Sequence, residues 1–84
     1  MNAPDILGEQ TTYGGLTVYI LDEGGGAYRV QIIDGADGLS STCAGYTAVG
    51  IRERALELAY GYLLKRDGTA PKPSSTLPWR PIRI

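Results

Sequence analysis

The feature that most constrains the fold is the segment 47–66, in which apolar residues recur with the period of an α-helix. Thr47 is a suitable N-cap, because its hydroxyl can accept a backbone N–H of the first turn. Lys65 and Arg66 bring positive charge to the last turn, where the helix dipole favours it. Gly68 suits the left-handed backbone that commonly ends a helix. We therefore predict one long helix, against which the remaining chain must pack.

This helix carries more apolar surface than one sheet can cover. A surface helix needs an apolar stripe somewhat over about 100° wide. At about 100° per residue, a first stripe is formed by Ala48, Ile51, Ala55, Leu58, Ala59 and Tyr62. A second stripe beside it is formed by Val49, Leu56, Tyr60, Leu63 and Leu64. We expect the first stripe to face the sheet. The second requires another cover, which is either the C-terminal segment folding back or another molecule, including a second copy of the chain.

Alternating apolar residues predict a small antiparallel sheet. Strands over 13–21 and 27–34 should form a β-hairpin around the glycine-rich turn 22–26. A short third strand is expected over 39–44. The fold class is therefore predicted to be α+β, with one small sheet and one long helix packed on it.

The whole chain, 1–84, is expected to form a single domain. Its expected divisions are a loose leader, a body and an extended proline-containing tail, at residues 1–12, 13–66 and 67–84. Prolines exclude a helix in the tail, and the last residues, 81–84, have the alternation of a short edge strand. Trp79 has two interpretations: it covers the second helix stripe, or it is an exposed anchor for a partner.

Charge is unevenly distributed along the chain. Residues 1–64 contain three basic and eight acidic side chains, for a net −5, whereas residues 65–84 contain five basic and one acidic, for +4. An acidic body disfavours nucleic acid and suits a basic protein partner. Nucleic-acid binding through Trp79 and the basic tail is the less favoured alternative.

The residues available for catalysis argue against an enzyme. The chain has no histidine and one cysteine, Cys43, so histidine-activated nucleophiles and histidine metal sites are excluded. The glycine run 24–26 precedes a strand rather than a helix, which favours a hairpin turn over a phosphate cradle. No pair of carboxylates is expected in a sheltered cleft. We therefore expect no catalytic residue, metal or cofactor. The single cysteine, with no signal segment or membrane-length apolar run, indicates a cytoplasmic protein.

Residues 17–74 resemble the HicB-like antitoxin domain. The similarity is carried by the glycine hairpin 22–30, by Gly45-Tyr46-Thr47 at the helix start, by the helix segments Ala55-Leu56 and Tyr62-Leu63-Leu64, and by the exit 68–74. The resemblance implies a partial RNase H-like fold and an antitoxin that occludes a small basic ribonuclease. The DNA-binding segment usual after this domain is expected to be missing, and Leu39-Ser40-Ser41-Thr42 replaces the family's Pro-Gly-Cys centre.

The sequence thus predicts a small inhibitor that binds another protein. The partner is either a toxin, as the resemblance implies, or a subunit of a bacterial defence complex, as for a phage-encoded anti-CRISPR inhibitor. On the helix, the candidate partner-binding residues are Leu56, Tyr60, Leu63 and Leu64. On the sheet face away from the helix they are Tyr19, Arg29 and Gln31, with Trp79 added from the tail.

Overall fold

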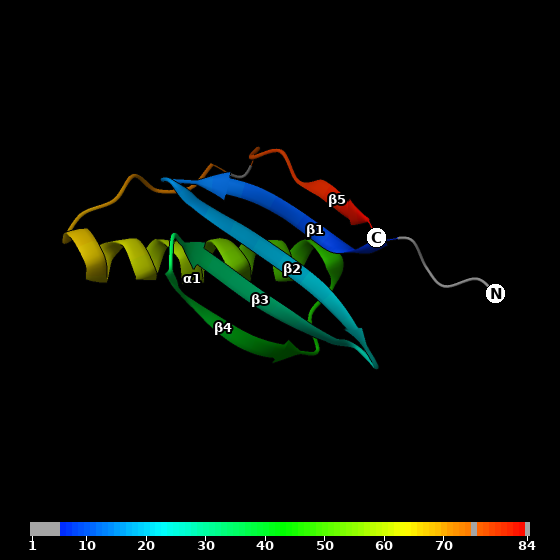
Figure 1. The fold of residues 1–84 in the computed structure, drawn as a ribbon. Coiled ribbons are helices and arrows are strands. Elements are labelled where there is room, and N and C mark those ends of the chain that lie inside the picture. Colours follow the sequence, from blue (N-terminus) through cyan, green and yellow to red (C-terminus); the bar gives the residue numbers. More distant parts are fainter. Residues whose placement is uncertain (1–5, 75, 84) are drawn as a thin grey trace.

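The computed structural model describes residues 6–74 and 76–83, and these form one antiparallel sheet with a helix packed on one face (Figure 1). In spatial order the strands run β4-β3-β2-β1-β5. In chain order the elements are β1 (Ile6–Tyr13), β2 (Leu16–Gly24), β3 (Ala27–Asp34), β4 (Asp37–Ala44), α1 (Ala48–Asp67) and β5 (Arg80–Arg83). The predicted α+β class, with a single long helix on an antiparallel sheet, is confirmed.

Helix α1 begins and ends where the sequence predicts. The backbone N–H of Gly50 donates to the Thr47 hydroxyl at 2.9 Å, and Gly68, with φ of 80°, donates its N–H to the Leu64 carbonyl at 2.8 Å. The first stripe buries Ile51, Ala55 and Ala59 against the sheet. The opposing core residues are apolar side chains of β2 and β3: Leu16, Val18, Ile20, Val30 and Ile32.

The expectation of a loose leader over 1–12 is wrong from Ile6 onward, because this segment forms strand β1. β1 lies between β2 and β5 and pairs with both. This pairing stabilises the segment as a strand although its sequence has little apolar alternation. Gly14 and Gly15 have φ of 59° and 82° and form the β1–β2 turn, rather than a bend within one strand. The strand predicted over 13–21 is accordingly β2, and Tyr13 belongs to β1.

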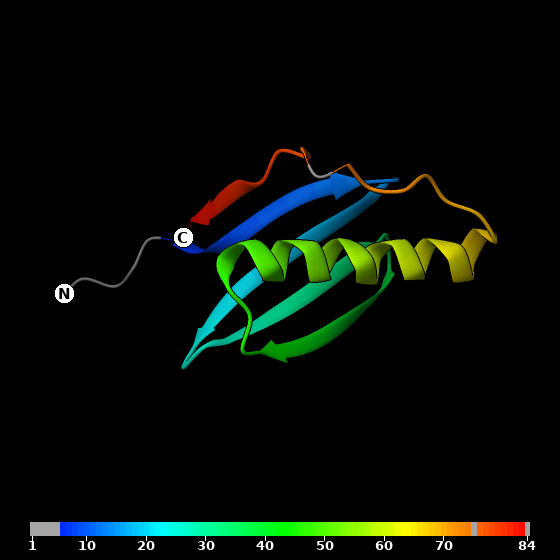
Figure 2. The ribbon, with the colours of Figure 1, turned by 180° about the vertical axis from the view of Figure 1, so that it is seen from behind.

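The segment after α1 returns along β1 to the far edge of the sheet (Figure 2). Tyr13 donates a hydrogen bond from its hydroxyl to the Pro71 carbonyl, which holds the start of this segment. Leu77 and Trp79 are half-buried against the core. β5 then pairs antiparallel with β1, with Arg80 opposite Gln10. The edge strand expected at 81–84 corresponds to β5, except for residue 84, which lies outside the described residues.

Candidate protein-binding surfaces

A groove runs along α1 where the helix faces the returning tail. It consists of two adjoining hollows of about 360 and 270 Å³, which share Glu53 and Leu56 in their walls. The first hollow is also lined by Val49, Arg52, Leu77 and Trp79, and the second by Glu57, Tyr60, Lys72 and Pro73. We call this surface the helix–tail groove. Val49 is 63% exposed, the most exposed of the large hydrophobic residues that the structure describes.

The tail covers only part of the second helix stripe. Leu63 is 2% exposed and belongs to the core, so the structure removes it from the surface that the sequence suggested. Leu56 is 8% exposed and lines both hollows. Tyr60 is half-buried at the groove wall, and Leu64 is 37% exposed outside the two hollows. Other parts of the same chain therefore cover part of the second stripe, and the rest of the stripe faces solvent.

Trp79 takes the covering role that is one of its two sequence interpretations, and its role as an anchor for a partner stays a prediction. It is half-buried against the core, and with Leu77 it also forms one wall of the helix–tail groove. A large aromatic ring held by the fold loses little conformational freedom when a partner packs on it. Trp79 can therefore be a structural cover and a contact residue at once.

The charged residues that line the groove include one carboxylate and one ammonium group, Glu53 and Lys72, that form no ion pair with another described residue. The Nε of Arg52 donates to Glu9 Oε1 at 2.7 Å, and this hydrogen bond raises the pKa of Arg52. Glu57 accepts from Arg54 at 3.0 Å. Glu53 is exposed, lines both hollows and has no ion pair with another described residue. Apolar side chains beside an unpaired carboxylate favour a partly apolar segment that carries a basic side chain.

The second predicted surface lies on the open face of the sheet, away from α1. Tyr19 of β2 is opposite Gln31 of β3, and Leu21 is opposite Arg29. The Nε of Arg29 donates to Glu23 at 2.8 Å, so its charge is already balanced. These side chains share one face, as the strand periodicity predicted, but this face is mainly polar.

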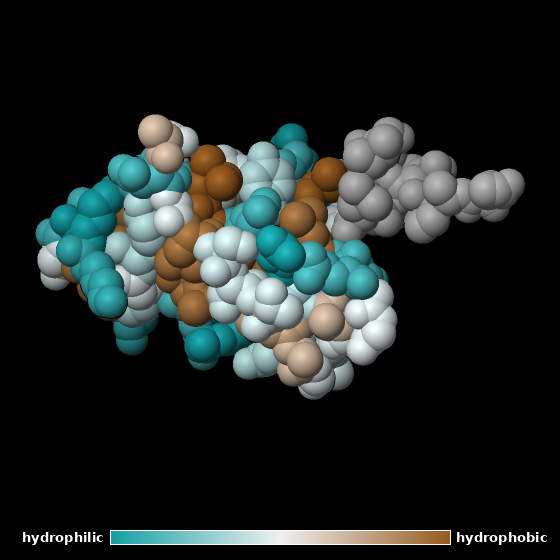
Figure 3. Space-filling view, turned by 60° about the horizontal axis from the view of Figure 1, so that its bottom comes forward, coloured by the Kyte–Doolittle hydropathy of each residue, from teal (hydrophilic) through white to brown (hydrophobic). Residues whose placement is uncertain are grey.

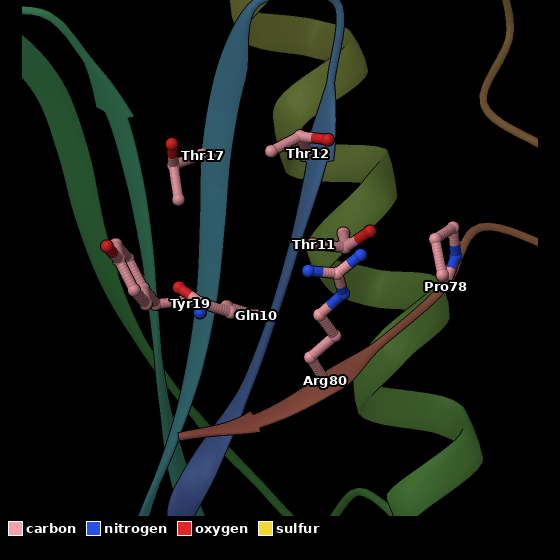
Figure 4. A pocket seen from close by; sticks show the side chains of 7 residues that line it. All are labelled: Gln10, Thr11, Thr12, Thr17, Tyr19, Pro78 and Arg80. Atoms are coloured by element: carbon pink, nitrogen blue, oxygen red, sulfur yellow. The ribbon is translucent and has the colours of Figure 1, made fainter. Parts of the chain in front are cut away.

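A polar pocket of about 340 Å³ opens on this face where the tail departs from β1 (Figure 4). Its lining comprises Gln10, Thr11, Thr12, Thr17, Tyr19, Pro78 and Arg80. Of these residues, the sequence predicts only Tyr19 as a candidate, because the pocket depends on strand β1, for which the sequence has no clear strand pattern. The Thr11 hydroxyl is buried without a hydrogen-bond partner in the described structure.

Three further findings concern metal-binding clusters, the cysteine and membrane-crossing helices in the described part of the chain. No group of three or more His, Cys, Asp or Glu side chains among them is arranged to hold a metal ion. Cys43 is a buried free thiol on β4. Across the same residues, no helix combines the length and apolarity needed to cross a membrane.

Comparison of the chain with protein-family models, with curated proteins and with solved structures found no match. The helix–tail groove and the open sheet face are therefore the features from which a function can be proposed.

Proposed function

We propose that the chain is a non-enzymatic inhibitor module that holds a basic, partly apolar segment of another protein in the helix–tail groove. The observation that carries this proposal is the exposure of Val49, 63%, beside the acidic Glu53 in a groove already lined by Leu56 and Trp79. Removing such apolar surface from water is favourable, by about 25 cal/mol per Å². The nearby carboxylate selects for a cation in the same segment.

The shape of the groove suits one segment rather than a flat interface. One wall is α1, and the other is the extended tail at Leu77 and Trp79. The two hollows follow each other along the helix, because Val49 and Tyr60 lie at their opposite ends. A partner segment can therefore place one apolar side chain in each hollow and a Lys or Arg near Glu53. Such buried anchors commonly supply most of the binding free energy of an interface.

The resemblance to the HicB-like domain supplies the identity of the proposed partner, a small basic ribonuclease toxin. The acidic body, with a net charge of −5 over residues 1–64, supports a basic partner independently of that resemblance. Long-range attraction of opposite charges speeds association. Inhibition would follow from occlusion of the toxin's RNA-binding surface, and the proposed compartment is the cytoplasm, where such a toxin meets RNA.

The experiment is an affinity capture from bacterial lysate with mass spectrometry, followed by an RNA-cleavage assay of the captured protein. Wild type is compared with Val49→Asp, which places a charge in the groove, and with Ile33→Asp as control. Ile33 is 39% exposed on β3, outside the groove, so its substitution tests for a general effect of an added carboxylate.

We expect wild type and Ile33→Asp to retain a small basic ribonuclease and to suppress its cleavage of RNA, and Val49→Asp to do neither. Capture of defence-complex subunits in its place would refute the antitoxin function. Retention of the same ribonuclease by all three proteins would refute the groove as the site.

A further inference from the structure

The two edges of the sheet are built differently. β5, at one edge, has only four residues, includes Pro81, and pairs with β1 through a register shift between Ile6 and Gly8. Proline, short length and irregular pairing are the usual means by which proteins prevent further strands from adding to an edge. β4, at the other edge, has eight residues that pair with β3 without interruption, from Asp34↔Asp37 to Ala27↔Ala44.

The outer side of β4 lacks this protection. Residues 38–44 contain no charged residue and no proline. Among the described residues no strand pairs with β4 on the side away from β3, so its outward backbone N–H and C=O groups are available. Figure 3, which brings this side of the molecule forward, shows hydrophobic surface exposed among neutral and hydrophilic residues. A regular, uncharged edge of this length can pair with another strand.

We propose that β4 pairs antiparallel with β4 of a second copy of the chain, around a two-fold axis that passes through Ser41. The pairing joins the two sheets into one sheet of ten strands. The interface is formed by the same residues on both copies, as in most symmetric dimers.

The position of the axis follows from side-chain direction. Residues directly opposite each other in an antiparallel pair point to the same face, so each residue must face one of equal parity in the second copy. An axis at Ser41 places Leu39 opposite Cys43 of the second copy, and both side chains point to the helix side. An axis at Ser40 would instead place Asp37 opposite Cys43, which is 8% exposed. Pairing two apolar residues favours Ser41.

The helices leave room for this pairing. α1 packs mainly on β2 and also on β3, so three to five strand spacings separate the two helices in the dimer. At about 4.8 Å per spacing this is about 14–24 Å, larger than the helix diameter of about 10 Å. The helix–tail groove lies toward β1, where Arg52 binds Glu9, and stays open on both copies. The dimer therefore offers two grooves.

Charged substitutions at Ser40 and Thr42 test the proposal, because both side chains are exposed and each faces the other position in the second copy. Sedimentation equilibrium of wild type should give twice the 9.0 kDa chain mass. Ser40→Lys/Thr42→Lys places like charges opposite each other and should weaken dimerisation at least about tenfold. Ser40→Lys/Thr42→Glu places opposite charges together and should restore the dimer. A wild type that stays at 9.0 kDa up to about 1 mM, or equal dimerisation of both variants, would overturn the proposal.

Disulfide formation tests the register. In a Cys43→Ala background, Ser41→Cys should crosslink two copies, since directly opposed strand residues have the Cα separation that a disulfide needs. Ser40→Cys in the same background is the matched control and should remain reduced in the same redox buffer. Crosslinking of Ser40→Cys in place of Ser41→Cys would show that the axis is elsewhere.

Discussion

Replacing Leu63 and Leu64 separately by alanine should give very different losses of stability. The two leucines are neighbours on α1, and the sequence assigns both to the second apolar stripe. In the structure Leu63 is 2% exposed and Leu64 is 37% exposed. Leu63 also lies under the β1–β2 turn, where a Cβ on Gly14 would come within 2.5 Å of its Cδ1.

The expected magnitudes follow from this burial. Leu63→Ala removes a packed side chain and leaves a cavity, which costs about 2–5 kcal/mol. Leu64→Ala removes a partly exposed side chain and gains slightly in helix propensity, so its cost should be below about 1 kcal/mol. For 84 residues the whole free energy of unfolding is about 4–13 kcal/mol. Leu63→Ala therefore removes a large fraction of the total.

Urea denaturation followed by circular dichroism measures both values under the same conditions. The slope of free energy against urea should stay constant, so that a shift in midpoint reports stability directly. Equal losses for the two variants, or a larger loss for Leu64→Ala, would refute the assignment of Leu63 to the core and with it the orientation of α1.

Three further outcomes are expected. Thr47→Ala removes the acceptor of the Gly50 N–H and should lower the free energy of unfolding by about 1 kcal/mol in the same urea assay; an unchanged midpoint would contradict the cap. Gly14→Ala should destabilise the fold, because the φ of 59° and the nearby Leu63 side chain both oppose a Cβ at this position. Its midpoint of thermal unfolding should be lower than that of Gly15→Ala, because an added Cβ on Gly15 has no atom within 4 Å. Hydrogen bonds from Arg66 and Tyr62 lower the pKa of Asp34, so its stabilising effect is complete above the ordinary value of 3.8 and is lost as pH falls through its lower folded value. Between pH 7 and pH 2 the free energy of unfolding should therefore fall less for Asp34→Asn than for wild type. Identical pH profiles for the two proteins would show that Asp34 does not contribute to acid unfolding.

The sequence predicts those elements whose signals are local. The period of α1, its cap at Thr47 and its exit at Gly68 all lie within one segment, and the structure confirms them. The β2–β3 hairpin is similarly set by its glycine turn, and the third predicted strand, 39–44, corresponds to β4 from Asp37 to Ala44. For these elements the pattern of apolar residues and the turn chemistry agree.

The missed features depend on contacts between distant segments. The sequence does not predict β1, because Gly8 to Thr12 shows little apolar alternation, yet β1 is paired with β2 on one side and with β5 on the other. The polar pocket that includes Arg80 could not be anticipated, because it forms only when β1 meets the tail. Burial of Leu63 likewise requires the β1–β2 turn, so the helix pattern alone could not separate it from Leu64.

The affinity of the captured partner for wild type, Val49→Asp and Ile33→Asp, measured by titration calorimetry, tests the central role of the helix–tail groove most directly. The proposed function requires that Val49→Asp bind at least about tenfold more weakly, a loss of about 1.4 kcal/mol, because a carboxylate would be buried where an apolar side chain was. Ile33→Asp should bind as wild type does. Equal affinity of wild type and Val49→Asp would contradict the claim that the groove is the binding site.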